Sequence, residues 1–429
     1  MRISTSQIYN TGTLGLQNNQ QNLFKLQNQM SSGRRVLTPE DDPVAAAQAL
    51  VVTQSKDLVG QYAENQGNAK AQLGILEGNL ATLSDMMLAV YERARDAQNK
   101  VYSDNERRFV AQELQDRLTE LVALSNTDDG TGQFLFSGYQ GATRPFAING
   151  SGAIVPPATQ PPVNYYGDEG ERLLQVGASR QLATSVPGAD LFMNIRAGNG
   201  TFATAVGGNS GGGINQGTAL IDEGSVMNPA LWSAAVNTHS SFRIEFSAGG
   251  TQYQIYNAAN VAMLAAPAAF VPGQAIPLQK TTAPAADFGA QVVISGTPAN
   301  GDRFNITPST NQSIFKTLQN LIGAISTPVN ATFSRTELDN RINAELANLD
   351  QAMDNLGRVR ADVGSRLKEL DFLTEGAADL DLQYATTLSE LQDLDYTKAI
   401  SEFTQQQIQL EAAQKTFAQV SRLSLFDIL

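Results

Sequence analysis

The chain has 429 residues, no cysteine, and a formal net charge of -13 from 29 Lys plus Arg against 42 Asp plus Glu. The negative charge disfavours binding to nucleic acid or anionic lipid, and the lack of cysteine excludes disulfide frameworks, thiolate metal sites and Cys nucleophiles. With 42% hydrophobic residues, most of the chain is expected to fold. The N-terminus has no continuous apolar stretch of signal-peptide length, and nowhere do about 18 apolar residues run unbroken, so neither a cleaved signal nor a membrane span is expected.

Heptad spacing predicts long helices in the two halves of the chain. Asp42 can cap a first helical turn and Pro43 suits the first helical position, so a helix should begin there and run to about Val101. A second helix is predicted over 104–125, and the same spacing returns between Ile342 and Leu370, which predicts that the two ends pack together. The first seam comprises Val59, Tyr62, Gln66, Ala69, Leu73, Leu76, Leu80, Leu83, Met87, Val90, Ala94, Ala97 and Val101.

The two terminal segments, 1–42 and 386–429, have the pattern of amphipathic helices diluted by Gln and Asn. Such helices are marginal alone, so we expect the N-terminal segment to be disordered in the monomer and both segments to serve assembly. For the seam from 59 to 101, an internal core is favoured instead. The predicted assembly residues are Leu16, Leu23, Met30, Phe403, Leu410 and Phe417 for axial packing, with Arg34, Asp41 and Asp42 shaping the adjoining turn.

The middle of the chain, 144–320, changes to Gly, Pro, Asn, Thr and short β-rich runs such as FRIEF and TQYQIY. It is predicted to be a β-rich insert, which the glycine run at 208–213 could divide into two subdomains. The chain is then a helical rod from 43–143 and 321–385, the insert, and the two terminal assembly segments. The expected fold class is α+β, an elongated helical rod or coiled coil built from both chain ends with an inserted β-rich outer region.

No enzymatic constellation is evident. His239 is the sole histidine, so an HExxH zinc site cannot form, and no Gly-x-Ser-x-Gly motif occurs. Asp128, Asp129 and Thr131 match only half of a calcium loop, and the glycine run lacks the Gly-Lys-Ser/Thr ending of a phosphate loop. We therefore expect no catalytic residue, cofactor or metal. An adhesive or glycan-binding insert stays open as an alternative, motivated by aromatic residues that are expected to be exposed, such as Tyr165, Tyr166 and Trp232.

Two stretches carry a family resemblance. Met-Ser-Ser-Gly-Arg-Arg-Val at 30–36 and Asp-Asp-Pro-Val-Ala at 41–45 resemble the N-terminal signature of the flagellin superfamily. The opening Met-Arg-Ile-Ser-Thr, the Gly-Gln-Phe-Leu-Phe-Ser-Gly at 132–138 and the Ser-Leu-Phe-Asp-Ile-Leu at 424–429 favour the hook-associated protein 3 branch. Flagellins usually open with an Ile-Asn-Thr-Asn run, which is absent here. The resemblance covers about 1–147 and 335–429.

The resemblance implies a structural, non-enzymatic protein at the junction of flagellar hook and filament. The implied partners are hook-associated protein 1, flagellin, further copies of the chain in a ring, and a cytoplasmic flagellar export chaperone. The implied location is the extracellular flagellum, reached through the flagellar type III apparatus without a cleaved signal. Flagellin itself is the alternative interpretation, and Arg34 or Arg35 could pair with acidic residues of a neighbouring subunit.

Overall fold

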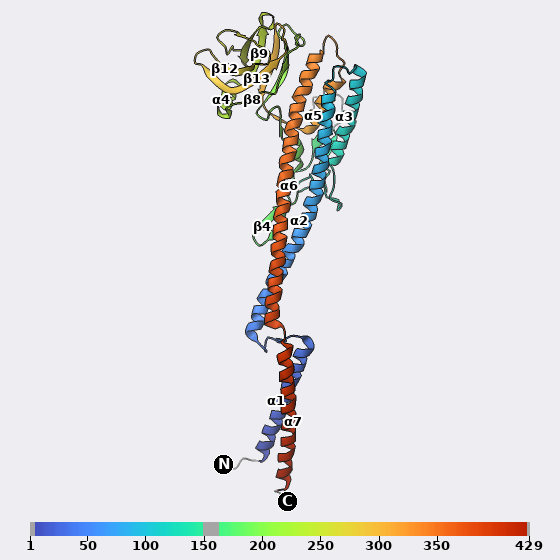
Figure 1. The fold of residues 1–429 in the computed structure, drawn as a ribbon, viewed down its shortest axis with the longest axis vertical. Coiled ribbons are helices and arrows are strands. Elements are labelled where there is room, and N and C mark those ends of the chain that lie inside the picture. The colour runs from blue at the N-terminus through green and yellow to red at the C-terminus, as the bar shows by residue number, and fades with distance from the viewer. Residues whose placement is uncertain (1–4, 149–162, 427–429) are drawn as a thin grey trace. The chain divides into compact units, whose positions relative to one another are not determined.

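The computed structural model describes residues 5–148 and 163–426 and has the predicted α+β fold class (Figure 1). The chain divides into two compact units. The first unit comprises Met1–Gly67, Val176–Ser179 and Asp371–Leu429, and the second comprises Asn68–Gln175 and Arg180–Leu370. The α-helices are α1 (Thr5–Ser32), α2 (Pro43–Asp96), α3 (Asp104–Leu124), α4 (Pro229–His239), α5 (Ile314–Ser326), α6 (Arg335–Gln392) and α7 (Tyr396–Phe426).

Helix α2 begins at Pro43, as predicted, because Asp42 Oδ1 accepts a hydrogen bond from the Ala45 N–H at 3.0 Å. It ends at Asp96, before the predicted end at Val101. In the connection that follows, the Val101 N–H donates to Asn99 Oδ1 at 3.1 Å instead of to a helical carbonyl. Val101 is consequently 86% exposed and does not belong to the buried seam.

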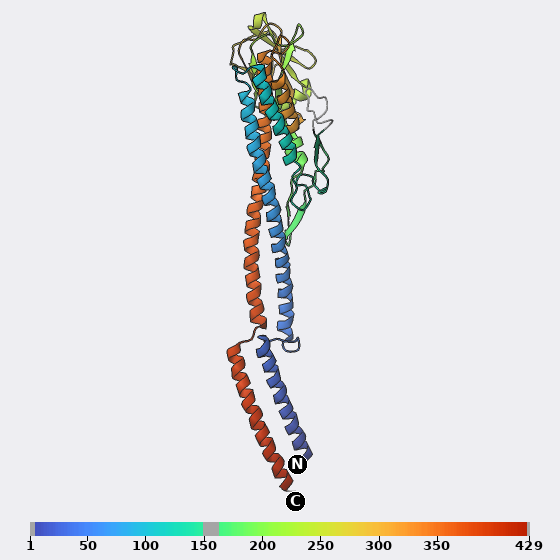
Figure 2. The same cartoon turned by 90° about the vertical axis from the view of Figure 1, so that its right-hand side faces the viewer.

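From Ala69 to Ala97, the predicted seam forms the helical core of the second unit, whereas Val59 and Tyr62 are half-buried residues of the first unit. The α2 positions Ala69, Leu73, Leu76, Leu80, Leu83, Met87, Val90 and Ala94, with Ala97 just beyond the helix, are buried. On α6, Ile342, Leu346, Leu349, Leu356, Val363 and Leu370 are buried in the same way. Arg360 on α6 binds Glu77 on α2, with 2.7 Å between Nη2 and Oε1, and the two helices lie side by side in Figure 2. The two halves of the chain therefore share one core, as the matching period predicted.

Helix α2 is also long and apolar enough to cross a membrane by length and composition alone. The core helix of a water-soluble protein has the same composition, and Leu73, Leu76, Leu80 and Leu83 of α2 are each at most 1% exposed within the second unit. This single helix is therefore weak evidence for a membrane span.

The second predicted helix is α3, and both of its ends follow from local sequence. Ser103 and Glu106 form a reciprocal capping box at its start. After its end, Asp129 Oδ1 accepts the N–H groups of Thr131 at 2.9 Å and Gln133 at 3.2 Å, which makes the Asp-Asp-Gly-Thr-Gly stretch a side-chain-stabilised turn.

The insert contains several small antiparallel sheets. A five-stranded sheet has the order β11-β10-β9-β14-β6, and a second sheet has the order β12-β13-β7 with β8 also on β13. The remaining pairs are β1 with β2, β3 with β4, and β5 with β15. The strands are β1 (Phe146–Ile148), β2 (Val163–Tyr165), β3 (Leu173–Gly177), β4 (Arg180–Ala183), β5 (Ile195–Arg196), β6 (Phe202–Asn209), β7 (Leu220–Ile221), β8 (Ser225–Val226), β9 (Phe242–Ser247), β10 (Gln252–Asn257), β11 (Ala268–Ala269), β12 (Ala275–Lys280), β13 (Ala286–Ser295), β14 (Asp302–Pro308) and β15 (Asn311–Gln312). Short helical turns η1 (Ala189–Met193) and η2 (Ala248–Gly250) interrupt them.

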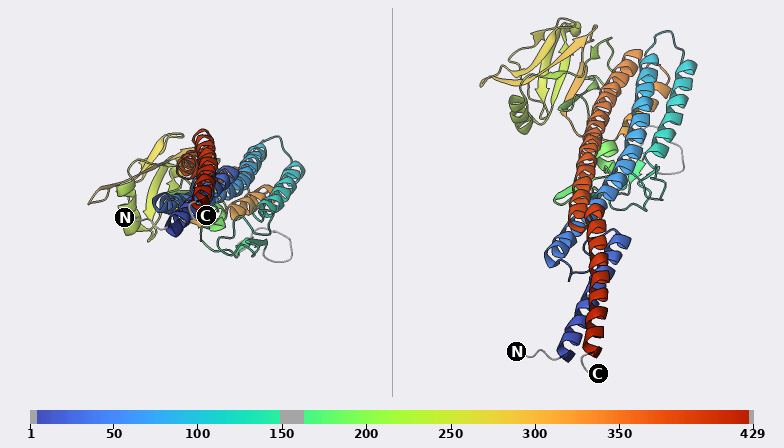
Figure 3. Two further views of the ribbon diagram at one scale, coloured as in Figure 1. Left: turned by 90° about the horizontal axis from the view of Figure 1, so that it is seen from below. Right: turned by 60° about the horizontal axis from the view of Figure 1, so that its bottom comes forward.

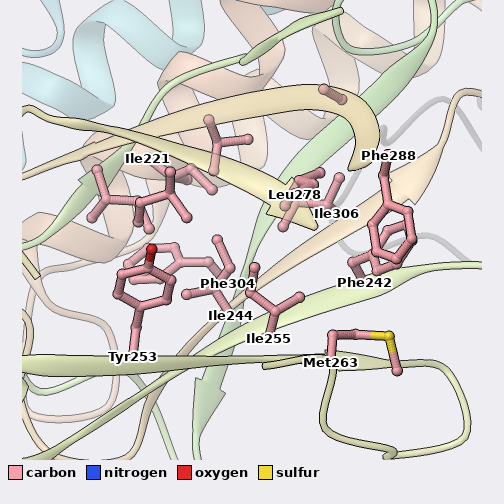
Figure 4. Close-up of a cluster of buried hydrophobic side chains, with 14 of the residues drawn as sticks. Ile221, Phe242, Ile244, Tyr253, Ile255, Met263, Leu278, Phe288, Phe304 and Ile306 are labelled. Atoms are coloured by element: carbon pink, nitrogen blue, oxygen red, sulfur yellow. The ribbon is translucent and has the colours of Figure 1, made fainter. Parts of the chain in front are cut away.

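The core of the two larger sheets is aromatic and aliphatic (Figure 4). Phe242, Phe288, Phe304 and Ile244 lie within it, and α4 contributes Trp232. Trp232 is 4% exposed and its ring centroid lies 5.0 Å from that of Phe202. The expectation that Trp232 is an exposed aromatic is therefore wrong, because it packs beneath the sheet as an anchor for α4.

The helix boundaries around the insert differ from those drawn from sequence. Helix α5 begins at Ile314, ahead of 321, because Ser313 Oγ accepts the Lys316 N–H at 3.2 Å and caps it. Helix α6 continues through 386 to Gln392, and α7 begins at Tyr396, where Asp395 Oδ1 accepts the Thr397 N–H at 2.9 Å. The division between rod and C-terminal segment thus lies at residues 393–395.

Candidate assembly interface

The terminal helices α1 and α7 pack on each other within the first unit (Figure 3). The rings of Tyr9 and Phe417 have centroids 5.2 Å apart. The Phe417 ring also packs closely against Gly12, because a Cβ atom on residue 12 would lie only 2.6 Å from the ring. All six residues predicted for axial packing lie half-buried on these two helices: Leu16, Leu23, Met30, Phe403, Leu410 and Phe417. The structure therefore brings together the helices that carry them, and their packing against other subunits stays a prediction.

The outward faces of the same helices carry a different apolar set. Leu14 and Phe24 on α1, and Ile400 and Ile408 on α7, are each more than half exposed. These residues were not predicted from the sequence, because they do not follow the spacing of three and four residues on which the prediction of the terminal helices was based. A helix with a second apolar face offers contacts beyond its partner helix.

The predicted turn joins the end of α1 to the break between α6 and α7. The Leu394 N–H donates to the Gly33 carbonyl at 2.9 Å, and the Arg35 N–H donates to the Gln392 carbonyl at 2.7 Å. Gly33 has a φ of +71°, a conformation that glycine adopts without strain. The Tyr396 hydroxyl donates to the Met30 carbonyl at 3.2 Å. These bonds tie together segments that are more than 350 residues apart.

Arg35, not Arg34, supplies the side chain that fixes this turn. Its Nη1 lies 3.0 Å from Asp42 Oδ2, and its Nη2 donates to the Leu391 carbonyl at 2.8 Å. The side-chain amide of Gln29 donates to the Arg35 carbonyl. Arg34 is exposed, and its guanidinium has no hydrogen bond or ion pair with any described residue. Arg34 pairs only through its backbone, as a bridge to Asp393.

Asp41 and Asp42 both accept hydrogen bonds from backbone N–H groups of the turn and of the first turn of α2. Asp41 forms an ion pair with Lys25 on α1 at 2.7 Å and accepts the N–H groups of Leu37 and Thr38. The hydrogen bond from Lys25, together with those backbone donors, lowers the pKa of Asp41 to about 2. The Ala45 N–H and then Arg35 lower the pKa of Asp42. Both carboxylates are therefore ionised near neutral pH and hold α1, the turn and α2 together.

His239 is the sole histidine of the chain and lies in the second unit. His239 packs between rings, with centroids 5.3 Å from Phe288 and 5.9 Å from Phe242, and burial lowers the pKa of His239. Within residues 5–148 and 163–426, no group of three or more His, Cys, Asp or Glu side chains could hold a metal ion. The candidate functional site is thus an assembly surface on the first unit.

Two known family regions match the helical parts of the chain. The bacterial flagellin N-terminal helical region matches residues 3–141, and the bacterial flagellin C-terminal helical region matches residues 346–429. These two matches contain α1 to α3, most of α6, and α7, and so include the turn and both terminal helices.

Sequence similarity to curated proteins extends over the whole chain. Flagellar hook-associated protein 3 of Salmonella typhimurium is 24% identical over 429 residues, covering 100% of this chain and 99% of that protein. The Escherichia coli protein of the same name is also 24% identical, over 433 residues. Among solved structures, the flagellar junction protein FlgL from Legionella pneumophila is 26% identical with a TM-score of 0.68, covering 81% of this chain and 100% of that chain. FlgL of Xanthomonas campestris is 26% identical with a TM-score of 0.62, covering 78% and 99%. The chain belongs to the flagellin superfamily, in its hook-associated protein 3 branch.

Proposed function

We propose that this chain connects the flagellar hook to the flagellin filament as a structural junction protein. The observation that carries the proposal is the similarity to hook-associated protein 3 over the full length of both chains, with both terminal helical regions matched. The chain is a structural component of the bacterial flagellum, and its task is mechanical.

The partners follow from that role. Hook-associated protein 1 would bind on the hook side and flagellin on the filament side, with further copies of this chain completing a ring. The exposed apolar residues on the outer faces of α1 and α7, including Phe24 and Ile408, support such contacts because more than half of each side chain is exposed among the described residues. Leu16, Leu23, Met30, Phe403, Leu410 and Phe417 would supply the axial packing against neighbouring subunits, and the outer faces of α1 and α7 would add further contacts.

The route to the flagellum is part of the same proposal. The chain would leave the cell unfolded through the flagellar type III apparatus, escorted by an export chaperone. The absence of cysteine suits a protein that folds outside without oxidation.

Location on the flagellum separates a junction protein from a filament-forming flagellin. Immunogold labelling of hook-basal bodies with filaments attached should give one narrow band at the hook-filament boundary. Label along the whole filament would make the chain a flagellin and overturn the junction role.

The adhesive alternative has lost most of its support. Trp232 is buried, and Tyr165 is half-buried with its hydroxyl 2.7 Å from the Asp168 carbonyl and 3.0 Å from that of Phe136. Of the three aromatics that motivated it, Tyr166 alone is exposed. A single tyrosine is not a binding platform for a glycan.

A further inference from the structure

The second half of α6 has an outward face of unusual composition. Phe372, Glu375, Asp379 and Leu382 follow one another at steps of three and four, and Glu390 continues the same face. Phe372 is 75% exposed and Leu382 is 68% exposed. We call these five residues the α6 stripe. The stripe is separate from the buried face of α6, which carries Leu370 and Ala377.

The α6 stripe is strongly acidic. Glu375, Asp379 and Glu390 are exposed and have no ion pair with any residue in the described ranges. The sequence contains no Lys or Arg between Lys368 and Lys398. An amphipathic face with uncovered aromatic and leucine side chains and unpaired carboxylates fits a partner surface that is both apolar and basic.

The connection between α2 and α3 has the complementary composition. Val101 is 86% exposed and Phe109 is 75% exposed, and Arg95, Lys100 and Arg108, which are close to them in the sequence, are exposed as well. We call these five residues the tip surface. Arg95 and Arg108 make no hydrogen bond or ion pair within the part of the chain that the structure describes.

The neighbouring arginines of the tip surface behave differently. Arg93 binds Glu113 at 2.7 Å and Arg107 binds Asp104. Arg95 and Arg108 are thus the exposed arginines of the tip surface that lack an ion pair among the described residues. Exposed large apolar residues flanked by cations mark an interaction surface rather than a merely solvated loop.

We propose that the tip surface of one copy docks on the α6 stripe of a second copy. Phe109 and Val101 would pack against Phe372 and Leu382, while Arg108 and its neighbouring cations face the unpaired carboxylates. Such a contact uses two different patches, so it is heterologous and propagates from copy to copy into a ring or a helical array. The proposal rests on the junction function, in which copies of this chain are neighbours.

The complementarity argues for a copy of this chain as the occupant. Two α6 stripes would repel each other, and so would two tip surfaces, which excludes a symmetric contact through either patch. One chain carries both halves of the match. The contact would orient each copy relative to the next, because like-charged patches cannot meet in the reverse orientation.

Crosslinking in assembled flagella tests the contact directly, since the chain has no native cysteine. The double variant Phe109→Cys/Asp379→Cys, treated with a short bismaleimide, should give covalent dimers and longer ladders of this chain. The matched control Phe109→Cys/Arg358→Cys places the second cysteine on an exposed α6 position outside the stripe and should give none. Equal yields in the two variants would overturn the proposal, as would crosslinks from the Phe109→Cys position to a different protein.

Charge exchange supplies a second readout. The starting variant for this test is Phe109→Cys/Glu375→Cys, which leaves Asp379 in place. In this variant, Arg108→Glu should lower the dimer yield roughly tenfold. Adding Asp379→Arg should restore the yield. Arg358→Glu is the control with the same charge change, and it should leave the yield unaltered. No loss with Arg108→Glu, or no recovery in the exchanged pair, would contradict the contact.

The junction role is measured separately on the same particles. Gold label at the hook-filament boundary without dimers would leave the junction function standing and remove this contact. Dimers together with label along the filament would keep the contact and remove the junction role.

Discussion

At the scale of single residues, the guanidinium of Arg35 joins the turn to both α2 and α6. It contacts Asp42 at 3.0 Å and the Leu391 carbonyl at 2.8 Å. We expect Arg35→Ala to destabilise the turn by about 1 kcal/mol, since the side chain is partly exposed and its ion pair is screened. The change should appear as faster amide exchange of residues 391–396.

Arg34 provides the matched control for Arg35. Its side chain has no partner among the described residues, so Arg34→Ala should change the exchange of 391–396 by no more than about 0.5 kcal/mol. Equal effects of the two substitutions would show that the guanidinium contacts of Arg35 contribute nothing to the turn.

Glu345 on α6 is a carboxyl group without an ion-pair partner in the second unit. It accepts hydrogen bonds from Asn348 at 2.8 Å, Asn320 at 2.9 Å and Gln312 at 3.2 Å. Lys316 is the nearby cation on α5, and its ammonium group donates to Gln319 instead. Burial raises the pKa of Glu345 to about 7, although the three amide donors act in the opposite direction.

The raised pKa of Glu345 predicts a loss of stability near neutral pH. The folded state binds the proton more tightly than the unfolded state, in which the pKa is near 4.5. The stabilisation from this group is therefore complete below pH 4.5 and is lost as the pH rises through about 7. Glu345→Gln should flatten the melting temperature of the second unit between pH 5 and 8, relative to the wild type.

The control for Glu345 is Glu223, which lines the same cavity but is exposed. Asp222 also lines this cavity, and although both side chains are exposed by surface area, partial desolvation by the surrounding protein raises the pKa of Asp222 and of Glu223 as well. In Glu223→Gln, the melting temperature of the second unit should still fall as the pH rises above 6, because Glu345 is unchanged. An unchanged slope in Glu345→Gln would assign the pH dependence to other groups. Asp41 is distinguishable because its pKa of about 2 gives the opposite sign, with stabilisation lost only as the pH falls from about 4 to 2.

At the scale of elements, Leu80 and Val101 test the limit of the heptad seam. Both obey the spacing, but Leu80 is fully buried in α2 and Val101 is 86% exposed beyond its end. Leu80→Ala should destabilise the second unit by about 2–5 kcal/mol because it leaves a cavity. Val101→Ala should change its stability by less than about 0.5 kcal/mol. Thermal unfolding monitored by circular dichroism measures both, and a large effect of Val101→Ala would mean that the seam continues past Asp96.

Helix ends could be predicted from the sequence where the residues that determine them are close together in the chain. The start of α2 was predictable because Asp42 and Pro43 act locally, within one turn of the helix. The break between α6 and α7 was not, because no Gly or Pro marks it and the Leu394 N–H is bonded to Gly33 at the far end of the chain. Trp232 was misplaced for a similar reason, since its burial depends on Phe202 and Phe242 on strands that pair only in the folded insert.

At the scale of the whole molecule, the fold class followed from composition and period, whereas the assembly surface followed only in part. Asp41 and Asp42 were assigned to the turn because adjacent acids before a proline favour a helix cap, and their part in assembly stays a prediction. Arg34 and Arg35 could not be told apart, since sequence does not say which of two neighbouring side chains faces inward. The outer apolar residues of α1 and α7 were missed because a helix with two apolar faces has no single period to detect.

Deletion of residues 390–429 tests whether the second unit folds without the C-terminal segment. The deletion removes α7 and the break at 393–395, so α1 loses its partner helix and the turn loses its backbone bonds. The second unit keeps its core, including Leu73, Leu80 and Leu356, because no residue of that core lies beyond Leu370. We expect a soluble protein with an unchanged melting transition for the second unit and rapid amide exchange throughout 5–32.

In cells, the truncated chain should fail to attach filaments to hooks. The matched variant Ile408→Ser keeps α7 and its contact with α1 but changes one exposed apolar residue, so it should weaken attachment without raising exchange in 5–32. Normal filaments in the deletion strain would contradict the assembly role of the termini. A rise in exchange with Ile408→Ser would instead mean that this residue stabilises the α1–α7 pair, which would move the assembly surface back to the seam that the spacing predicted.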